Sequence, residues 1–414
     1  MLDVQKLRQD FPLLRDYREA YLDNAATSQR PQCVLDAMTD FYCHSNANPM
    51  RGFYPLSLAA TDAYEKARAR VARFIGAGDP NEVIFTRNAS ESLNLVAYTY
   101  GLANLKPGDE VAVSILEHHS NMLPWQMVCQ KTGATLRYLD CEPNGSFSAE
   151  TLDQGINERT KLVAVTHVSN VLGCVSPVRD IVERAHRVGA VVVLDGAQSV
   201  PHMPVNVTEL DVDFLAFSGH KLMGPMGIGV LWGKMTHLEK MPPFLTGGEM
   251  IESVTREGAV YAEVPHKFEA GTVNAAGAVG LAAAMDYIDS IGFADMMAQE
   301  EKLVTRVMAG IAEIPGVHVL GDTNPKNHTG IVNFIVDGVH PHDVAEILEA
   351  DGVNVRSGHH CAPPLLAHLG CRASTRASFM FYNTEEEADR LVETLKNVRG
   401  RMGLCAIGAF TMKS

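Results

Sequence analysis

The chain has 414 residues, of which 46% are hydrophobic and 20% are charged. This composition can form a sizeable core, so it excludes disorder as the main state, and the length suggests about two or three domains. The 35 Lys and Arg against 49 Asp and Glu give a net charge of −14, which argues against nucleic acid as the main partner because it repels phosphate backbones.

Membrane and secretory features are also missing from the sequence. No apolar run reaches the roughly 18 residues that a membrane span needs, and the N-terminal residues contain no apolar signal core. The eight cysteines are scattered and form no C-x-x-C pair. We therefore expect a reduced cytoplasmic protein, without a membrane partner, whose thiols are mostly buried.

Short apolar runs alternate with helical stretches from about residue 80 to residue 235. The predicted strands are Val83–Thr86, Glu110–Ile115, Lys161–Thr166, Ala190–Leu194, Phe214–Phe217 and Gly227–Leu231. Such nearly continuous apolar strands are typical of a mainly parallel sheet that helices cover on both faces. Pro177–Val188 has the apolar stripe of one covering helix. The pattern predicts an α/β layer domain.

The pattern changes after residue 270 and favours a smaller α+β domain. A long Ala- and Met-rich helix is expected over 275–314, interrupted near Gly292. It is followed by strands at 330–336, 353–356 and 376–382, a helix at 342–350, and a final helix that Thr384 and Glu387 begin as a capping box. We expect a large domain over 16–266, and a small domain formed by 1–15 and 267–414.

Polar residues follow five successive predicted strands. Asn88 and Glu91 resemble a capping box at a helix start, where free N–H groups suit a phosphate. His118, Asn170 and Asp195 follow the next strands, and Ser218-Gly-His-Lys221 ends another. Because ligands of open α/β sheets bind beyond the carboxyl ends of the strands, these groups indicate a single site.

Lys221 and Asp195 together suit pyridoxal phosphate. Lys221 can form a Schiff base with the aldehyde, and Asp195 can keep the pyridine nitrogen protonated so that the ring withdraws electrons. Taken singly, Lys221 would be interpreted as a solvated loop lysine and Asp195 as a helix cap or turn residue. His118 is either a ring-stacking residue or a structural histidine.

A second group of reactive side chains lies in Arg356-Ser-Gly-His-His-Cys361-Ala-Pro-Pro364. A buried thiol and a metal site are both possible by residue type, given His359, His360, Cys361, His368 and Cys371. No second ligand pair has zinc-type spacing, so we expect no metal. Cys361 is better suited to be an exposed nucleophile whose thiolate a nearby positive charge favours. Arg376 is either a two-pronged carboxylate ligand or a surface ion pair.

Six motifs spread along the chain point to a known family. They are Tyr21-Leu-Asp-Asn-Ala-Ala26, Glu117-His-His-Ser-Asn121, Leu194-Asp-Gly-Ala-Gln-Ser199, Phe217-Ser-Gly-His-Lys-Leu222, Phe268-Glu-Ala-Gly-Thr272 and Arg356-Ser-Gly-His-His-Cys-Ala362. With them the chain resembles the group II cysteine desulfurases and selenocysteine lyases (SufS/CsdA-like). These are pyridoxal-phosphate enzymes of fold type I in the class V aminotransferase superfamily. The last motif is the most specific, because it separates group II desulfurases from group I enzymes and aminotransferases.

The resemblance implies a role for each matching residue. For the cofactor it implies covalent attachment at Lys221, pairing of Asp195 with the ring nitrogen, contact of Gln198 with the ring hydroxyl and stacking of His118. The implied phosphate ligands are Ala89, Ser90, Ser218, His220 and, from the second subunit of a homodimer, Thr272. For the substrate carboxylate the implied ligands are Asn170, Arg376, Arg356 and the backbone at Ala25 and Ala26.

The resemblance also implies the reaction. Cys361 takes the sulfur of L-cysteine as a persulfide and leaves L-alanine, and L-selenocysteine is accepted too. The sulfur then passes to an acceptor protein of a SUF-type system for iron–sulfur cluster assembly. An aminotransferase or another β-lyase of this fold, and an idle phosphate-binding scaffold, are the alternatives.

Three positions depart from the family's pattern. Met50 stands where a His is usual before Arg51, and Arg87-Asn-Ala-Ser90 replaces Gly-Thr-Thr, with one hydroxyl fewer near the phosphate. Ser374-Thr375 precede Arg376 where Cys is common. The tail after Arg401 matches no motif. These departures concern the phosphate contacts and fine substrate preference more than the reaction.

Overall fold

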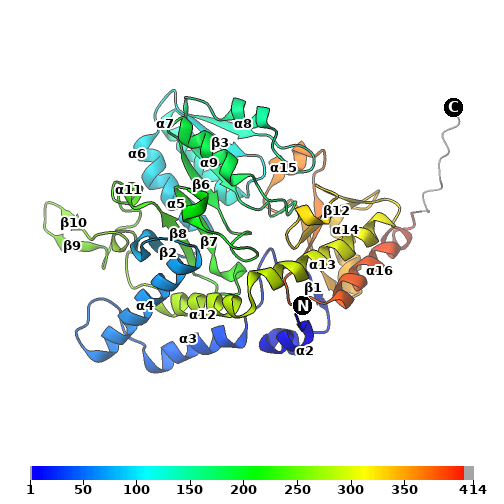
Figure 1. The fold of residues 1–414 in the computed structure, drawn as a ribbon, viewed down its shortest axis with the longest axis horizontal. Helices are drawn as coiled ribbons and strands as arrows, with labels where there is room; N and C mark the ends of the chain where they lie inside the picture. Colours follow the sequence, from blue (N-terminus) through cyan, green and yellow to red (C-terminus); the bar gives the residue numbers. More distant parts are fainter. Residues whose placement is uncertain (1, 405–414) are drawn as a thin grey trace.

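A seven-stranded sheet forms the centre of the computed structural model, which describes residues 2–404 (Figure 1). Its strands, in spatial order, are β2 (Val83–Thr86), β8 (Gly229–Gly233), β7 (Phe214–Ser218), β6 (Val191–Asp195), β5 (Thr160–Thr166), β3 (Glu110–Ser114) and β4 (Thr135–Leu139). The neighbours from β7 to β4 are parallel, while β8 runs antiparallel to both β2 and β7. The predicted mainly parallel sheet is confirmed.

Alternate residues of each central strand enter two different apolar clusters. In β6, Val192 and Leu194 pack on one face of the sheet, and Val191 and Val193 pack on the other. The first face is covered by α3 (Gln32–His44), α4 (Pro55–Phe74), α8 (Ala149–Gly155), α9 (Val178–Arg187) and α12 (Ala275–Ile291). The opposite face is covered by α5 (Ala89–Val96), α7 (Leu123–Thr132) and α11 (Met235–Leu238). Burial on both faces explains why these strands are apolar without alternation.

A smaller antiparallel sheet lies beside the first, towards the right of Figure 1. Its order is β11 (Val317–Val319), β12 (Ile331–Val336), β15 (Ser374–Ser378) and β14 (Arg356–Gly358). It packs with α13 (Phe293–Ala312), α14 (Pro341–Ala350) and α16 (Glu385–Arg401) around a separate cluster that includes Phe334 and Leu391. The capping box of Thr384 and Glu387 that begins α16 is confirmed.

The N-terminal segment contacts both apolar clusters. Phe11 and Leu14 belong to the cluster of the large sheet, whereas Ala20 and Leu22 belong to the cluster of the small one. β1 (Ala20–Tyr21) pairs in parallel with β13 (Val353–Asn354). The division of the chain into domains at residues 16 and 267 stays a prediction.

The remaining elements are short. They are α1 (Val4–Leu7), α2 (Pro12–Asp16), α6 (Leu102–Asn104), α10 (Val207–Leu210), α15 (Pro363–His368) and the hairpin of β9 (Ile251–Val254) and β10 (Ala259–Tyr261). The hairpin projects from the left of the molecule in Figure 1. Over residues 2–404, no helix combines the length and apolar character that a membrane crossing requires.

Three details differ from the sequence prediction. β4 was missed because it is an edge strand with only Leu139 fully buried, so its sequence is not continuously apolar. The predicted strand at 353–356 is split between β13 and β14, which belong to different sheets. The predicted strand at 376–382 is shifted, since β15 ends at Ser378 and the buried residues after it pack as a loop.

Candidate active site

A cavity of about 250 Å³ opens at the carboxyl ends of the parallel strands. Nearly all predicted site residues line it, although they come from segments far apart in the chain. These are Ala25, Ala26, Ala89, Ser90, His118, Asn170, Asp195, Gln198, Ser218, His220, Lys221, Arg356, Cys361 and Arg376. Thr272 is absent from this set.

Asp195 and Lys221 occupy the floor of the cavity. Asp195 is the last residue of β6 and Lys221 follows the neighbouring strand β7 in a short turn. Burial raises the pKa of Asp195, whose Oδ1 accepts a hydrogen bond from Ala197 N at 2.9 Å. Burial lowers the pKa of Lys221 to about 8, and the charge of Asp195 opposes that shift. The site therefore holds a buried carboxylate and a largely desolvated amine next to each other.

The start of helix α5 forms one end of the cavity. The side chain of Asn88 accepts from Glu91 N at 3.0 Å, and Ser218 Oγ accepts from Ala89 N at 2.8 Å. Ser90 Oγ lies 2.6 Å from Ser120 Oγ. Hydroxyl groups and backbone N–H groups at a helix start form a favourable site for an anion.

The predicted capping box at this helix start is only half formed. Glu91 accepts a hydrogen bond from Arg87 N at 2.5 Å instead of from the N-cap residue Asn88. The carboxylate of Glu91 also pairs with the Arg87 side chain at 2.9 Å. The local charge pair therefore draws Glu91 away from the position that a reciprocal box requires.

His118 lies in the turn after β3. Its Nδ1 accepts from Ser120 N at 3.1 Å, so the ring proton of the neutral form is on Nε2. Burial, together with the positive charge of Lys221, lowers the pKa of His118 to about 3. The imidazole is consequently neutral at physiological pH and is suited to stacking on a ring.

Arg376 is buried at the opposite end of the cavity, with 2% of its surface exposed. Its Nη1 donates to Asn170 O at 2.8 Å and its Nη2 to Asp23 Oδ1 at 3.2 Å. Its Nε is buried and has no protein partner in residues 2–404. The alternative of a surface ion pair is therefore wrong.

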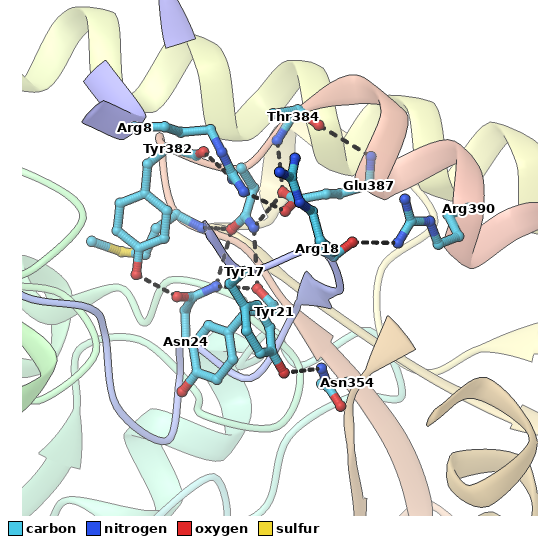
Figure 2. A network of polar contacts seen from close by, with 12 residues as sticks. Arg8, Tyr17, Arg18, Tyr21, Asn24, Asn354, Tyr382, Thr384, Glu387 and Arg390 are labelled. Atoms are coloured by element: carbon cyan, nitrogen blue, oxygen red, sulfur yellow. Dashed lines mark hydrogen bonds and ion pairs between the residues drawn. The ribbon is translucent and has the colours of Figure 1, made fainter. Parts of the chain in front are cut away.

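Backbone next to Arg376 is held by a buried polar network that Figure 2 shows around Asn24. Asn24 Oδ1 accepts from the Tyr382 hydroxyl at 2.5 Å, and its amide nitrogen donates to Ser378 O at 2.7 Å. Ala25 N donates to Ser378 Oγ at 2.9 Å. Ala25 O accepts from Gln198 Nε2 at 2.8 Å. This network fixes the Ala25–Ala26 backbone where it meets the cavity.

Cys361 lies on the loop between β14 and α15, and its side chain is exposed. This agrees with the expected exposed nucleophile. The expectation of mostly buried thiols is wrong for Cys33 and Cys43, which lie on the outer side of α3. Helical periodicity does not show which side of α3 its cysteines occupy. Cys129, Cys141 and Cys174 are buried, Cys371 is half-buried, and Cys405 lies outside the described residues.

Two predicted positions lie away from the cavity. Thr272 lines a separate hollow with Arg87, Glu91 and Phe268. Met50 lines a shallow surface hollow beside Arg51, which pairs with Glu249 at 2.7 Å. Thr272 therefore does not meet the other site residues within one chain.

Several contributors were not given a role from the sequence. Ser120 and Thr166 line the cavity, and Asp23 pairs with Arg376. Glu117 joins the ends of two strands by accepting from Thr166 N and from Asn121 Nδ2, each at 2.6 Å. Burial raises the pKa of Glu117 to about 8. In the sequence, these four residues stand out only by their position at the ends of predicted strands or inside the family motifs.

Residues 2–404 contain no group of three His, Cys, Asp or Glu side chains arranged to hold an ion. Of the histidines near Cys361, His360 Nε2 lies 3.1 Å from Ser374 Oγ and His368 Nε2 lies 2.6 Å from Cys141 O.

Comparison with known proteins gives one consistent family. Residues 20–391 match the model of the class V aminotransferases. A probable cysteine desulfurase of Halalkalibacterium halodurans is 47% identical over 406 residues, which cover 97% of this chain and 99% of that protein. A cysteine desulfurase of Haloferax volcanii is 46% identical, with 96% and 97% of the two chains covered.

Solved structures agree in fold. A cysteine desulfurase from Thermococcus onnurineus superimposes with a TM-score of 0.93 at 44% identity, and the cysteine desulfurase CsdA from Escherichia coli with 0.89 at 38% identity. In both cases 97% of this chain and 99% of the other are covered. The chain therefore belongs to the class V aminotransferase family and, within it, to the cysteine desulfurases.

Proposed function

We propose that this protein is a pyridoxal phosphate-dependent enzyme that converts L-cysteine to L-alanine and retains the sulfur as a persulfide on Cys361. One observation carries the proposal: the exposed thiol of Cys361 lines the same cavity as the half-buried Lys221 and the buried Asp195. An aminotransferase or a simple β-lyase has no use for a nucleophilic thiol at that place. The family membership supports the same choice.

The cavity fits pyridoxal phosphate group by group. Asp195 is a buried carboxylate that a protonated ring nitrogen would neutralise, and buried charges require such partners. Lys221 would take the aldehyde, while Ala89, Ser90, Ser218 and His220 would hold the phosphate. Gln198 would contact the ring hydroxyl, and His118 would stack on the ring. When bound, this cofactor withdraws electrons from the substrate's carbon atoms.

The substrate carboxylate would bind between Arg376 and Asn170. Arg376 supplies a charged group, and the backbone at Ala25 and Ala26 lines the same cavity. Arg356 is exposed and adds positive charge near the cavity mouth. These groups hold the substrate so that its sulfur faces the Cys361 loop.

Cys361 performs the transfer step. Its thiolate attacks the substrate sulfur, an S–S bond forms, and the bond between the substrate's carbon and sulfur breaks. The electron pair remains with the carbon, which takes up a proton to become the methyl group of alanine. The cationic side chains of Lys221 and Arg376 line the same cavity as this thiol.

An absorbance spectrum of the purified protein, followed by L-cysteine addition and product analysis, tests the proposal. We expect the yellow cofactor band, a change in that band on adding L-cysteine, and equal amounts of alanine and transferred sulfur. A colourless protein that cannot be reconstituted, or formation of pyruvate instead of alanine, would contradict it.

Asp195→Asn should keep part of its cofactor and lose turnover by about a hundredfold. A neutral amide no longer holds the ring nitrogen protonated, and loss of one preorganised electrostatic partner acts on this scale. Turnover and cofactor content of the purified variant are the measurements. Asp389→Asn, which alters an exposed ion pair with Arg306, is the control. Wild-type turnover in Asp195→Asn would make the carboxylate structural.

Arg376→Lys should raise the Michaelis constant for L-cysteine about ten- to a hundredfold. An ammonium group cannot reproduce the planar guanidinium contacts, and a lost charge-assisted hydrogen bond costs about 1.5–3 kcal/mol. Initial rates over a range of cysteine concentrations give this value, with Arg306→Lys on the surface as the control. Unchanged kinetics in Arg376→Lys would remove Arg376 from the site.

The wider role follows from the same chemistry. We infer that L-selenocysteine is also a substrate, and that the persulfide sulfur goes to an acceptor protein of a SUF-type system for iron–sulfur cluster assembly in the cytoplasm. We further infer a homodimer, in which Thr272 of the second subunit completes the phosphate site. Its position outside the cavity of its own chain supports that arrangement. The small domain, as predicted, would carry the Cys361 loop.

A further inference from the structure

The Cys361 loop, residues His359–Ala362, has an unfavourable backbone conformation. His360 has φ of 50° and Cys361 has φ of 57°, so two consecutive residues with side chains are in the left-handed region. This conformation is unfavourable for residues with side chains and persists where the surrounding structure holds it. The loop connects β14 to α15, and its cysteine is exposed.

Three contacts hold the loop in this conformation. His119 N donates to Cys361 O at 2.8 Å, and Asn170 Nδ2 donates to His360 O at 2.8 Å. His360 Nε2 lies 3.2 Å from Ser374 O and 3.1 Å from Ser374 Oγ. The carbonyl groups of both strained residues therefore accept hydrogen bonds from the large sheet's loops: Cys361 O from the loop after β3, and His360 O from the loop after β5.

Asn170 provides the only side-chain donor to the loop backbone in the described part of the chain. It is buried, with 6% of its surface exposed, in a turn closed by the bridge between Val168 and Val175. Its backbone oxygen accepts from Arg376 Nη1 at 2.8 Å. One residue on a closed turn thus contacts both the Cys361 loop and the buried arginine.

We propose that Asn170 is a positioning residue for Cys361, in addition to its place in the substrate site. One N–H of its amide fixes His360 O, and the other is available to the substrate carboxylate. Because one amide group contacts both partners, Asn170 fixes the distance between the Cys361 loop and the substrate. This inference rests on the proposed function for the substrate's identity, while the contact with the loop does not depend on it.

Hydrogen–deuterium exchange of the purified protein without substrate tests the contact directly. Asn170→Ala removes the donor, and Asn170→Asp keeps the side-chain shape while leaving only acceptors towards His360 O. We expect exchange in peptides 356–366 and 116–123 to be about fivefold faster or more in both variants, because one hydrogen bond of ordinary strength is lost. Helix α12 should exchange as in the wild type, which shows that the fold is intact.

Ser169→Ala is the matched control. Ser169 is buried in the same turn and accepts from Val171 N and Leu172 N at 3.3 and 3.2 Å, without contacting the Cys361 loop. Its replacement should leave exchange in peptide 356–366 unchanged. Equal exchange in wild type and both Asn170 variants would overturn the proposal, and so would an equal increase in Ser169→Ala.

Steady-state kinetics separate positioning from simple substrate binding. If Asn170 positions Cys361, kcat of Asn170→Ala at saturating L-cysteine stays about tenfold below the wild type, since a displaced nucleophile is not restored by more substrate. A rise in KM with wild-type kcat would overturn the positioning role. Failure of the proposed function would be seen separately, as a wild-type enzyme that releases no alanine while the exchange difference persists.

Discussion

Replacing Cys361 by serine should reduce sulfide release from L-cysteine by roughly a thousandfold or more, the scale on which loss of a nucleophile acts in other enzymes. The variant should remain yellow and still change its absorbance when L-cysteine is added, because Lys221, Asp195 and Arg376 are untouched. A hydroxyl is a far weaker nucleophile than a thiolate towards sulfur. Part of the selenocysteine cleavage should survive, since selenium leaves more readily without an attacking thiol.

Sulfide assays with a thiol reductant and mass spectrometry of the wild type after brief exposure to cysteine are the measurements. The added sulfur should lie on the peptide that contains Cys361. Cys43→Ser is the matched control, because Cys43 is also exposed but lies on α3, away from the cavity. A persulfide on another cysteine, or wild-type desulfuration by Cys361→Ser, would disprove the mechanism.

Lys221→Ala should fold normally and lose covalent attachment of the cofactor together with essentially all turnover. Burial lowers the pKa of Lys221 to about 8, so a minor but much larger fraction of this amine than of an exposed lysine is neutral and nucleophilic at physiological pH. The change removes the cationic neighbour of the buried Asp195 carboxylate, but a bound cofactor would still offer its ring nitrogen to Asp195, so the free energy of unfolding of the cofactor-loaded protein should not fall sharply. Thermal unfolding and turnover test both parts.

Borohydride reduction followed by peptide mapping identifies the attachment point. In the wild type the reduced label should appear on the peptide with Lys221, and in Lys221→Ala it should be absent. Lys131→Ala is the control, because this lysine lies on α7 above the ring of Tyr98. Label on a peptide without Lys221 would refute the assignment.

Much of the large sheet could be predicted because its strands are buried on both faces. The end of each apolar run marks the end of a strand. Because the carboxyl ends of parallel strands lie at one edge of the sheet, the residues after these runs were expected to lie close together. That reasoning correctly brought His118, Asp195 and Lys221 into a single cavity. It failed at β4, whose exposed edge removes the continuous apolar signal.

The rest of the site depends on contacts that no local pattern records. Asp23 reaches Arg376 across 353 positions of the sequence, and Asn170 reaches the backbone of His360 across 190. Every residue has a backbone carbonyl, so the identity of the accepting residue does not reveal such a hydrogen bond. The exposure of Cys33 and Cys43 was missed for a related reason, since a helix shows a period but not which side its neighbours cover.

The pairing of β1 with β13 has a consequence for synthesis on the ribosome. Residues 20–28 leave the ribosome early. In the folded protein Ala20 pairs with Val353, the Asn24 side chain accepts a hydrogen bond from the Tyr382 hydroxyl, and Ser28 Oγ donates to Lys221 O at 2.9 Å. A nascent chain shorter than 353 residues lacks the strand partner of Ala20, and one shorter than 382 residues lacks the partner of Asn24, so the early segment stays incompletely paired until translation is almost complete.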